Sequence, residues 1–137
     1  MTQSIRYRTK VHFRNGRSGR KRLHQGESPA PIEPGRIPLV SRLMALAIRF
    51  DGLLHDGAVK DQAELALLGH VSRARVTQIM NLLMLAPDIQ ESILFLPRTM
   101  RGRDPILDRD VRPITLTLDW RKQRRLWQDL ATKKSRK

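Results

Sequence analysis

The chain has 137 residues, a length typical of one domain. It carries 27 Lys and Arg residues against 13 Asp and Glu, so its formal net charge is +14, and DNA, RNA or an anionic membrane surface is the partner we expect first. The absence of cysteine excludes disulfides and thiolate metal sites. No run of about 18 apolar residues predicts a transmembrane helix.

The positive charge is concentrated at the two ends of the chain. Residues 1–36 hold nine Lys and Arg against two acids, and residues 98–137 hold thirteen against five, whereas residues 37–97 hold five against six. Residues 1–36 are also poor in aliphatic side chains, so we predict a disordered basic arm there. Two interpretations stay open: a solvated tail that aids solubility, or an arm that follows phosphates or enters a groove.

Between residues 37 and 131 the pattern predicts an all-α domain of five or six short helices, followed by a basic tail at 132–137. The first helix covers about 38–56, with Pro38 in its first turn and Gly57 as its stop. Its apolar residues recur at spacings of four and three and form one stripe: Leu39, Leu43, Leu46, Phe50 and Leu53.

Residues 61–85 predict two helices joined by a tight turn. Asp61 is a good N-cap, and Glu64 lies three residues later, as in a capping box that opens a helix over 62–68. Gly69 and His70 break that helix. Ser72 is a second N-cap, and it opens a helix that we expect to reach about Leu85.

The remaining elements follow in order. A helix begins at Ala86-Pro87-Asp88 and ends at Pro97, and an exposed basic loop covers 98–105. We expect Asp108 to cap a short helix through Val111, stopped before Pro113, and residues 114–118 to form an extended linker. Asp119 caps a last helix over 120–131, with four packing residues: Trp120, Leu126, Trp127 and Leu130.

The pair 62–68 and 72–84 has the dimensions of a helix-turn-helix, in which the second helix enters the major groove of DNA. A helical wheel that turns Val76, Ile79 and Leu83 inward places polar and small side chains outward. No acid occurs from Ser72 to Ala86. Asn and Gln can bind adenine, Arg can bind guanine, and Thr can contact a thymine methyl group. We therefore predict that this face reads bases through Arg73, Ala74, Thr77, Gln78 and Asn81.

Phosphate contacts are predicted at the start of the same helix and in the basic C-terminal part of the chain. Arginine side chains and a helix N-terminus both suit phosphate. The predicted phosphate-contacting residues are Ser72, Arg75, Arg101, Arg103, Arg121, Arg124 and Arg125. An ordinary helical corner with a neutral polar face is the alternative interpretation of 61–85.

Three motifs follow one another in this region: Gln62-x-x-Leu65-Ala66, Val71-Ser72-Arg73-x-x-Val76-x-Gln78-Ile79 and Leu82-Leu83-x-Leu85-x-Pro87-x-Ile89-Gln90. Together they resemble the helix-turn-helix of ParB/KorB-like DNA-binding domains over about 62–96. The resemblance implies that the DNA lies against Ser72, Arg73, Arg75, Thr77, Gln78 and Asn81. The turn position usually held by Gly is His70 here, and His tolerates a left-handed backbone better than most residues.

Two further motifs are Leu107-x-x-x-Val111-Arg112-Pro113 and Trp120-Arg121-x-Gln123-x-x-x-Trp127. With them, the stretch 39–130 also resembles small bacterial proteins of mobile elements and recombinase neighbourhoods, a resemblance that implies no activity. We expect no enzyme, no cofactor and no metal site. His12, His24, His55 and His70 are scattered, and Asp104, Asp108 and Asp110 have arginine neighbours that favour ion pairing or capping over Mg²⁺. Although 120–130 is basic with bulky apolar residues, we expect its tryptophans to pack on the domain rather than bind a membrane.

The sequence thus favours a cytoplasmic, nucleoid-associated protein that binds double-stranded DNA sequence-specifically. Transcriptional regulation, or an accessory step of partition or recombination, is the expected role. Such motifs often act as homodimers on palindromes, although no dimer interface is evident in the sequence. The alternative is an RNA-binding or scaffold protein that acts through its basic ends, with the helix pair serving only as core.

Overall fold

The computed structural model describes residues 8–15, 20–28 and 34–136. The chain separates into two compact units, residues 1–33 and residues 34–137. The first contains two strands, β1 (Val11–Asn15) and β2 (Lys21–Gln25). The second contains the helices.

The described part of the first unit is an antiparallel hairpin, in which Val11 pairs with Gln25, Phe13 with Leu23 and Asn15 with Lys21. The prediction of a purely all-α fold with a disordered arm over 1–36 is therefore wrong for these two strands. Val11, Phe13 and Leu23 alternate with polar residues at the period of a strand. The high content of Arg and Gly in this region favours disorder, and so short an alternation is hard to recognise within it. Of the predicted arm, residues 1–7, 16–19 and 29–33 lie outside the described residues.

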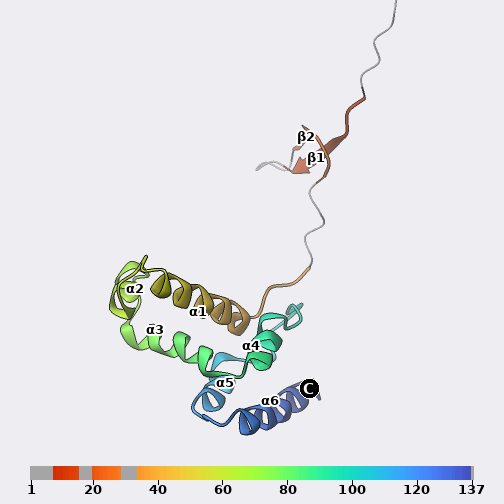
Figure 1. Ribbon diagram of the computed structural model, residues 1–137. Coiled ribbons are helices and arrows are strands. Elements are labelled where there is room, and N and C mark those ends of the chain that lie inside the picture. The colour runs from red at the N-terminus through yellow and green to blue at the C-terminus, as the bar shows by residue number, and fades with distance from the viewer. Residues whose placement is uncertain (1–7, 16–19, 29–33, 137) are drawn as a thin grey trace, which may run out of the picture. The chain divides into compact units, whose positions relative to one another are not determined.

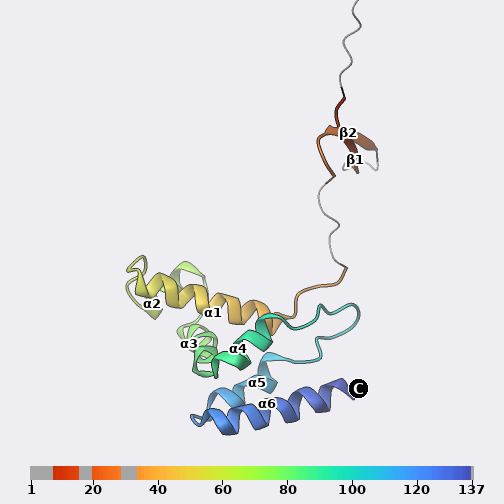
Figure 2. The same cartoon turned by 45° about the vertical axis from the view of Figure 1, so that its right-hand side comes forward.

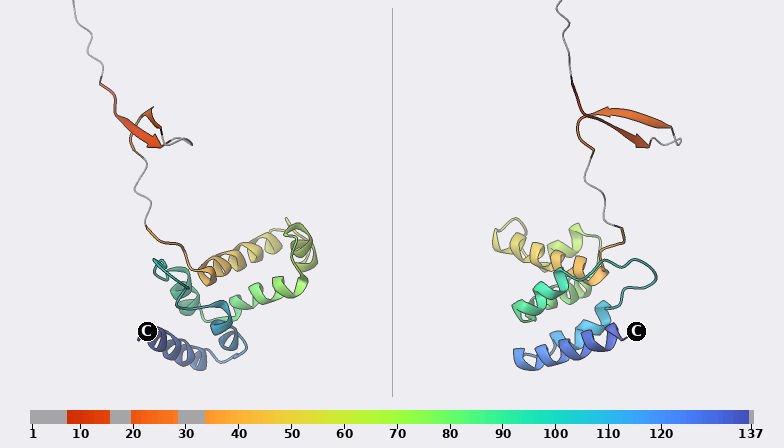
Figure 3. Two further views of the ribbon diagram at one scale, coloured as in Figure 1. Left: turned by 180° about the vertical axis from the view of Figure 1, so that it is seen from behind. Right: turned by 90° about the vertical axis from the view of Figure 1, so that its right-hand side faces the viewer.

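The second unit is a helical domain arranged in layers, with α3 and α4 between α1 on one side and α6 on the other (Figures 1, 2 and 3). A short 3₁₀ turn, η1, continues α3. The elements are α1 (Leu39–His55), α2 (Gln62–Leu68), α3 (Arg73–Met80), η1 (Asn81–Met84), α4 (Pro87–Leu94), α5 (Asp108–Thr115) and α6 (Trp120–Ser135).

The main hydrophobic core joins α1, α3, η1, α4 and α5, and Trp127 and Leu130 of α6 pack against it. A smaller cluster of Val59, Leu65, Ala66 and Val76 holds α2 against α3. The buried residues of the main core are Val40, Leu43, Met44, Ala47, Ile79, Leu82, Leu85, Ala86, Ile89, Ile93, Ile106, Val111 and Ile114.

Helix α1 has the predicted extent, and four residues of the predicted stripe pack in the two hydrophobic clusters: Leu43, Leu46, Phe50 and Leu53. The most deeply buried residues, however, lie beside that stripe. Pro38 is its N-cap, and Gly57, at φ +74°, follows its C-cap. Val40, Met44 and Ala47 are fully buried, whereas Leu39 is exposed. A wide apolar face offers more than one stripe at helical spacing, and only the neighbours in the fold select one of them.

The junction between α3 and α4 is held by two glutamine side chains. Helix α3 was predicted to reach about Leu85, but it is α-helical only to Met80 and then tightens into η1. Gln90 donates to the carbonyl oxygens of Leu83 and Leu85 at 3.1 and 2.9 Å. The fully buried Gln123 of α6 accepts from the N–H of Ala86 at 2.8 Å and donates to the Met84 carbonyl at 3.0 Å. Backbone groups released by the change of helix type are thereby satisfied.

Helix α5 runs through Pro113 rather than stopping before it, so the predicted extended linker at 114–118 is wrong for its first two residues. Asp108 is the first helical residue rather than the cap, which is Leu107. A proline removes the single N–H bond to the residue four positions earlier, here the exposed Arg109. Burial of Val111 and Ile114 outweighs that loss.

Helix α6 extends to Ser135 and so includes part of the predicted tail at 132–137. Lys134 lies 3.3 Å from Asp110 of α5, an ion pair that favours the last helical turn. Of the four residues predicted to pack, Trp127 and Leu130 do so, whereas Trp120 and Leu126 are exposed. Gln123, which was not predicted, is the buried residue of this helix.

Candidate nucleic-acid interface

Helices α2 and α3 begin at the predicted caps. The carboxylate of Asp61 accepts the N–H of Glu64 at 2.9 Å, and Glu64 in turn accepts the N–H of Lys60 at 2.7 Å. The hydroxyl of Ser72 accepts the N–H of Arg75 at 3.1 Å. The two helices therefore start where the sequence indicated, and a four-residue turn separates them.

The turn explains why Gly and His stand where they do. His70 adopts φ +53°, the only non-glycine residue with a positive φ among the described residues. A Cβ atom at Gly69 would lie 3.2 Å from the Leu65 carbonyl oxygen, which is tighter than an ordinary contact. Glycine thus permits a close backbone approach at position 69, and His70 takes the left-handed conformation predicted for it.

The buried and exposed faces of α3 agree with the helical wheel near its start. Val76 and Ile79 are buried, whereas Arg73, Ala74, Thr77 and Gln78 are exposed. Asn81 differs, because it begins η1 and is only partly exposed. Leu82 is fully buried and Leu83 only partly, although Leu83 also packs against the main core, since a 3₁₀ turn advances each residue further around the axis than an α-helix does.

Two of the exposed polar groups of this face are already hydrogen-bonded within the protein. The hydroxyl of Thr77 donates to the Gln62 side chain of α2 at 3.3 Å. Gln78 accepts from Nη1 of Arg75 at 3.2 Å. Both side chains keep further hydrogen-bonding capacity, since the amide nitrogen of Gln78 still has donors and the Thr77 oxygen can still accept.

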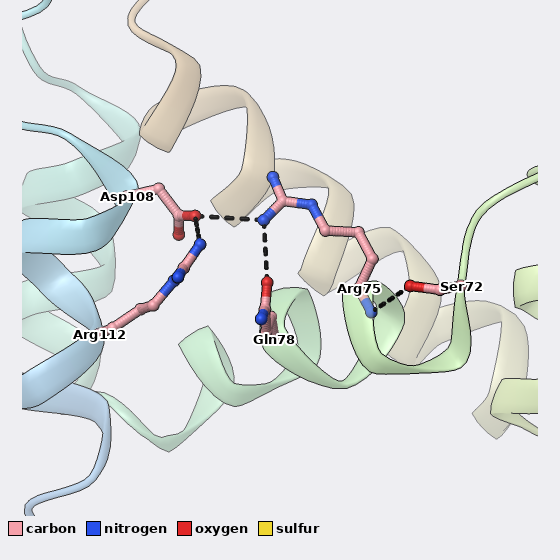
Figure 4. A network of polar contacts seen from close by, with 5 residues as sticks. All are labelled: Ser72, Arg75, Gln78, Asp108 and Arg112. Atoms are coloured by element: carbon pink, nitrogen blue, oxygen red, sulfur yellow. Dashed lines mark hydrogen bonds and ion pairs between the residues drawn. The ribbon is translucent and has the colours of Figure 1, made fainter.

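Arg75 does not project freely toward solvent, as a phosphate contact would (Figure 4). Its Nη1 lies 3.2 Å from Oδ2 of Asp108 on α5, and the same oxygen accepts from Arg112 at 2.8 Å. The Asp108 side chain is only 14% exposed, so water screens this cluster less than it would a surface pair. Residues 72, 75, 78, 108 and 112 form one polar network that connects α3 to α5.

The basic loop at 98–105 is anchored at both ends rather than loosely exposed. Thr99 exchanges backbone hydrogen bonds with Arg36, and Asp104 accepts the N–H of Leu39 at 2.9 Å and the Thr99 hydroxyl at 2.7 Å. The guanidinium of Arg36 adds an ion pair to Asp104 at 3.2 Å and a short hydrogen bond to the Gly102 carbonyl.

These contacts favour the ionised form of Asp104 and fix the position of the loop at 98–105. The Leu39 N–H, first of all, and then Thr99 and Arg36 hold the pKa of Asp104 below its ordinary value. The two arginines predicted to contact phosphate, Arg101 and Arg103, are exposed on the loop that these contacts fix.

The predicted arginines of α6 fall into two classes. Arg121 and Arg125 are exposed, and neither has an ion pair among the described residues. Arg124 instead binds Asp88 of α4 through Nε at 2.9 Å and Nη2 at 3.1 Å. This hydrogen bonding lowers the pKa of Asp88 and raises the pKa of Arg124. Arg124 is therefore committed to a contact within the protein.

Asp104, Asp108 and Asp110 act in ion pairs and caps, as predicted. Of the neighbouring arginines, Arg112 pairs with Asp108, whereas Arg103 and Arg109 form no ion pair among the described residues. Although burial raises the pKa of Asp110, the Leu107 N–H and Lys134 more than offset it, so that its pKa is lowered. The partner of Asp108 across the fold, Arg75, lies 33 positions away. Only the i, i+4 pair of Asp108 with Arg112 was visible as a local signal.

Within the described ranges, no group of three or more His, Asp or Glu side chains is placed to hold a metal ion. None of the described helices combines the length and the apolar composition that crossing a bilayer requires. Comparisons with protein-family models, with curated proteins and with solved structures find no match to this chain.

Proposed function

We propose that this protein binds double-stranded DNA sequence-specifically, with α3 in the major groove as the second helix of a helix-turn-helix like that of ParB/KorB-like domains. The observation that carries the proposal is the exposed face of α3. It presents Arg73, Ala74, Thr77 and Gln78, with no acid between Ser72 and Ala86. Such side chains offer hydrogen bonds and small apolar contacts to base edges.

We assign the phosphate contacts to fewer residues than the sequence predicted. Arg101, Arg103, Arg121 and Arg125 are exposed and lack ion pairs among the described residues, whereas Arg75 and Arg124 already bind Asp108 and Asp88. Ser72 caps α3 through its oxygen, and its hydroxyl proton is free to donate. Regulation of transcription, or an accessory step of partition or recombination, is the role that we propose for such binding.

The test begins with a selection of bound sequences from random duplex DNA, which supplies a preferred site. The double variant Thr77→Ala, Gln78→Ala should then lose about 30-fold or more of the preference for that site over a scrambled duplex, because it removes two base contacts that each discriminate by roughly 1–3 kcal/mol. Both residues are exposed, so the melting temperature should change little.

Gln128→Ala, which removes an exposed amide from α6, is the matched control and should keep the preference. An unchanged preference in the double variant contradicts the α3 model. Equal binding of the wild-type chain to all duplex DNA, with tighter binding to RNA, favours instead an RNA-binding protein that acts through its basic ends.

A further inference from the structure

The hairpin of the first unit has two chemically different faces. In a strand, successive side chains point to opposite sides, and directly paired residues share a side. His12 pairs with His24 and Arg14 pairs with Arg22, so these four residues form one face, termed here the Arg–His face. Val11, Phe13, Lys21, Leu23 and Gln25 occupy the other face.

Ring contacts support this sorting of side chains. The imidazole rings of His12 and His24 stack across the strands, with centroids 5.6 Å apart and planes inclined by 22°. The next pair on the same face consists of two guanidinium groups. All of β2 and Arg14 of β1 are exposed to solvent.

The Arg–His face carries positive charge that no group of the described chain neutralises. Neither the Arg14 nor the Arg22 side chain has an ion pair or hydrogen bond among the described residues, and β1 and β2 contain no acid. The nearest described acid in sequence, Glu27, pairs with Lys10. Like charges directly opposite each other in an antiparallel pair are destabilising, so a bound polyanion would relieve an unfavourable contact of the free protein.

The width of the hairpin indicates which polyanion it suits. The major groove of B-form DNA is about 12 Å wide and admits a two-stranded ribbon. The major groove of A-form RNA is deep and narrow, and side chains cannot read it. A ribbon with a basic face therefore matches duplex DNA better than duplex RNA.

We propose that the hairpin is a second DNA-contacting element, which enters a groove of duplex DNA with its Arg–His face toward the nucleic acid. The proposal rests on the function proposed above and adds a contact that is independent of α3. Arg14 and Arg22 bind phosphates or base edges, and His12 and His24 supply hydrogen-bonding groups beside them.

Two adjacent residues of β2 provide the test in the full-length chain. Arg22→Gln and Lys21→Gln each remove one charge, from opposite faces of the same ribbon. Arg22→Gln should weaken binding to duplex DNA on the order of fivefold near 0.15 M salt and reduce the slope of log affinity against log salt by about 0.9, whereas Lys21→Gln should change both much less. The double variant Arg14→Gln, Arg22→Gln should lose about twice that slope.

A conservative variant guards against a hairpin that merely fails to form. Arg14→Lys with Arg22→Lys keeps both charges and should retain the salt slope of the wild type. Equal losses from Lys21→Gln and Arg22→Gln would overturn the proposal, because they would mean that only net charge matters. The same difference between the two variants on duplex RNA would also overturn it.

Different results would contradict the proposal for the hairpin and the proposal for α3. If the hairpin variants keep the wild-type slope while Thr77→Ala, Gln78→Ala loses sequence preference, only the hairpin proposal is wrong. If the wild-type chain shows no preference for any duplex DNA, the proposed function is wrong, whatever the hairpin variants do.

Discussion

Arg75 can either pair with Asp108 inside the protein or contact a DNA phosphate, and these two roles compete. Its guanidinium is shared between Gln78 on the exposed face of α3 and Asp108 on α5. Asp108 also holds Arg112, so a single carboxylate compensates two positive charges beside the candidate interface. Asp108 therefore opposes the approach of a polyanion while it positions α3.

Asp108→Asn should release Arg75 and remove a negative charge near α3. Affinity for duplex DNA should rise on the order of fivefold near 0.15 M salt, and the salt slope should steepen by about 0.9, as expected for one added phosphate contact. Loss of the ion pairs should lower the melting temperature by several degrees, measured by circular dichroism.

Asp129→Asn is the charge-matched control, because Asp129 is exposed on α6 and has no ion pair among the described residues. An equal rise in affinity from this control would show that net charge, and not the release of Arg75, is responsible.

The structural role of some single residues can be predicted from the sequence, whereas that of others cannot. His70 was expected to take the left-handed turn position, because it stands where glycine usually does, and its φ is +53°. Gln123 has no such local signal. It looks like one more polar residue in a basic helix, and its three hydrogen bonds go to backbone groups 6 to 39 positions away.

At the scale of elements, α1 depends on a side chain from a distant loop. Leu39, the first residue of α1, donates its N–H to Asp104, which also binds Thr99 and Arg36. An acidic group at a helix N-terminus satisfies a free donor and interacts favourably with the helix dipole. One carboxylate thus fixes the start of α1 and closes the loop 98–105.

Asp104→Asn should lower the free energy of unfolding by about 2 kcal/mol at neutral pH, because charged hydrogen bonds are lost. The pKa of Asp104 lies below its ordinary value of 3.8, so its contribution is full above that pH and is lost as the pH falls through the lowered pKa. Urea titrations at several pH values should show the two proteins converging in acid.

Asp51→Asn removes an exposed carboxylate from α1 itself and serves as the control. A stability difference for Asp104→Asn that persists unchanged far below pH 3 would contradict the assignment of the effect to the charge of Asp104.

Elements with their own caps and apolar period were predictable, and elements that depend on partners were not. Asp61 and Ser72 cap α2 and α3 as expected, because these contacts are local. The end of α3 at Met80 and the passage of α5 through Pro113 depend on buried neighbours elsewhere in the fold. The hairpin was missed because the basic composition of the arm masked a short alternation of apolar residues.

At the scale of the whole molecule, the charge is divided between the two units. Residues 1–33 hold eight Lys and Arg against two acids, a net of +6, which leaves +8 of the total +14 for residues 34–137. Among the described residues, both hydrophobic clusters lie in the second unit. Stability and sequence preference are therefore expected to reside there, and much of the salt-dependent affinity in the first.

A chain of residues 34–137 should fold cooperatively, with a melting temperature close to that of the full chain. It should keep the preference for a selected site but bind it more weakly, with a shallower salt slope, since up to six units of charge are gone. Calorimetry and binding titrations at several salt concentrations provide the measurements. An unaltered slope would mean that residues 1–33 make no contact with phosphates.

The bonds of Gln123 have a mechanical consequence for this second unit. The side chain of Gln123 on α6 binds the backbone at Met84, the last residue of η1, and at Ala86, the N-cap of α4. It also donates to the carbonyl oxygen of Thr117, before α6 begins. The backbone between η1 and α4, which continues α3, therefore cannot move against α6 without breaking buried hydrogen bonds. The exposed residues of α3 and the exposed arginines of α6, Arg121 and Arg125, are consequently held at a fixed distance from each other.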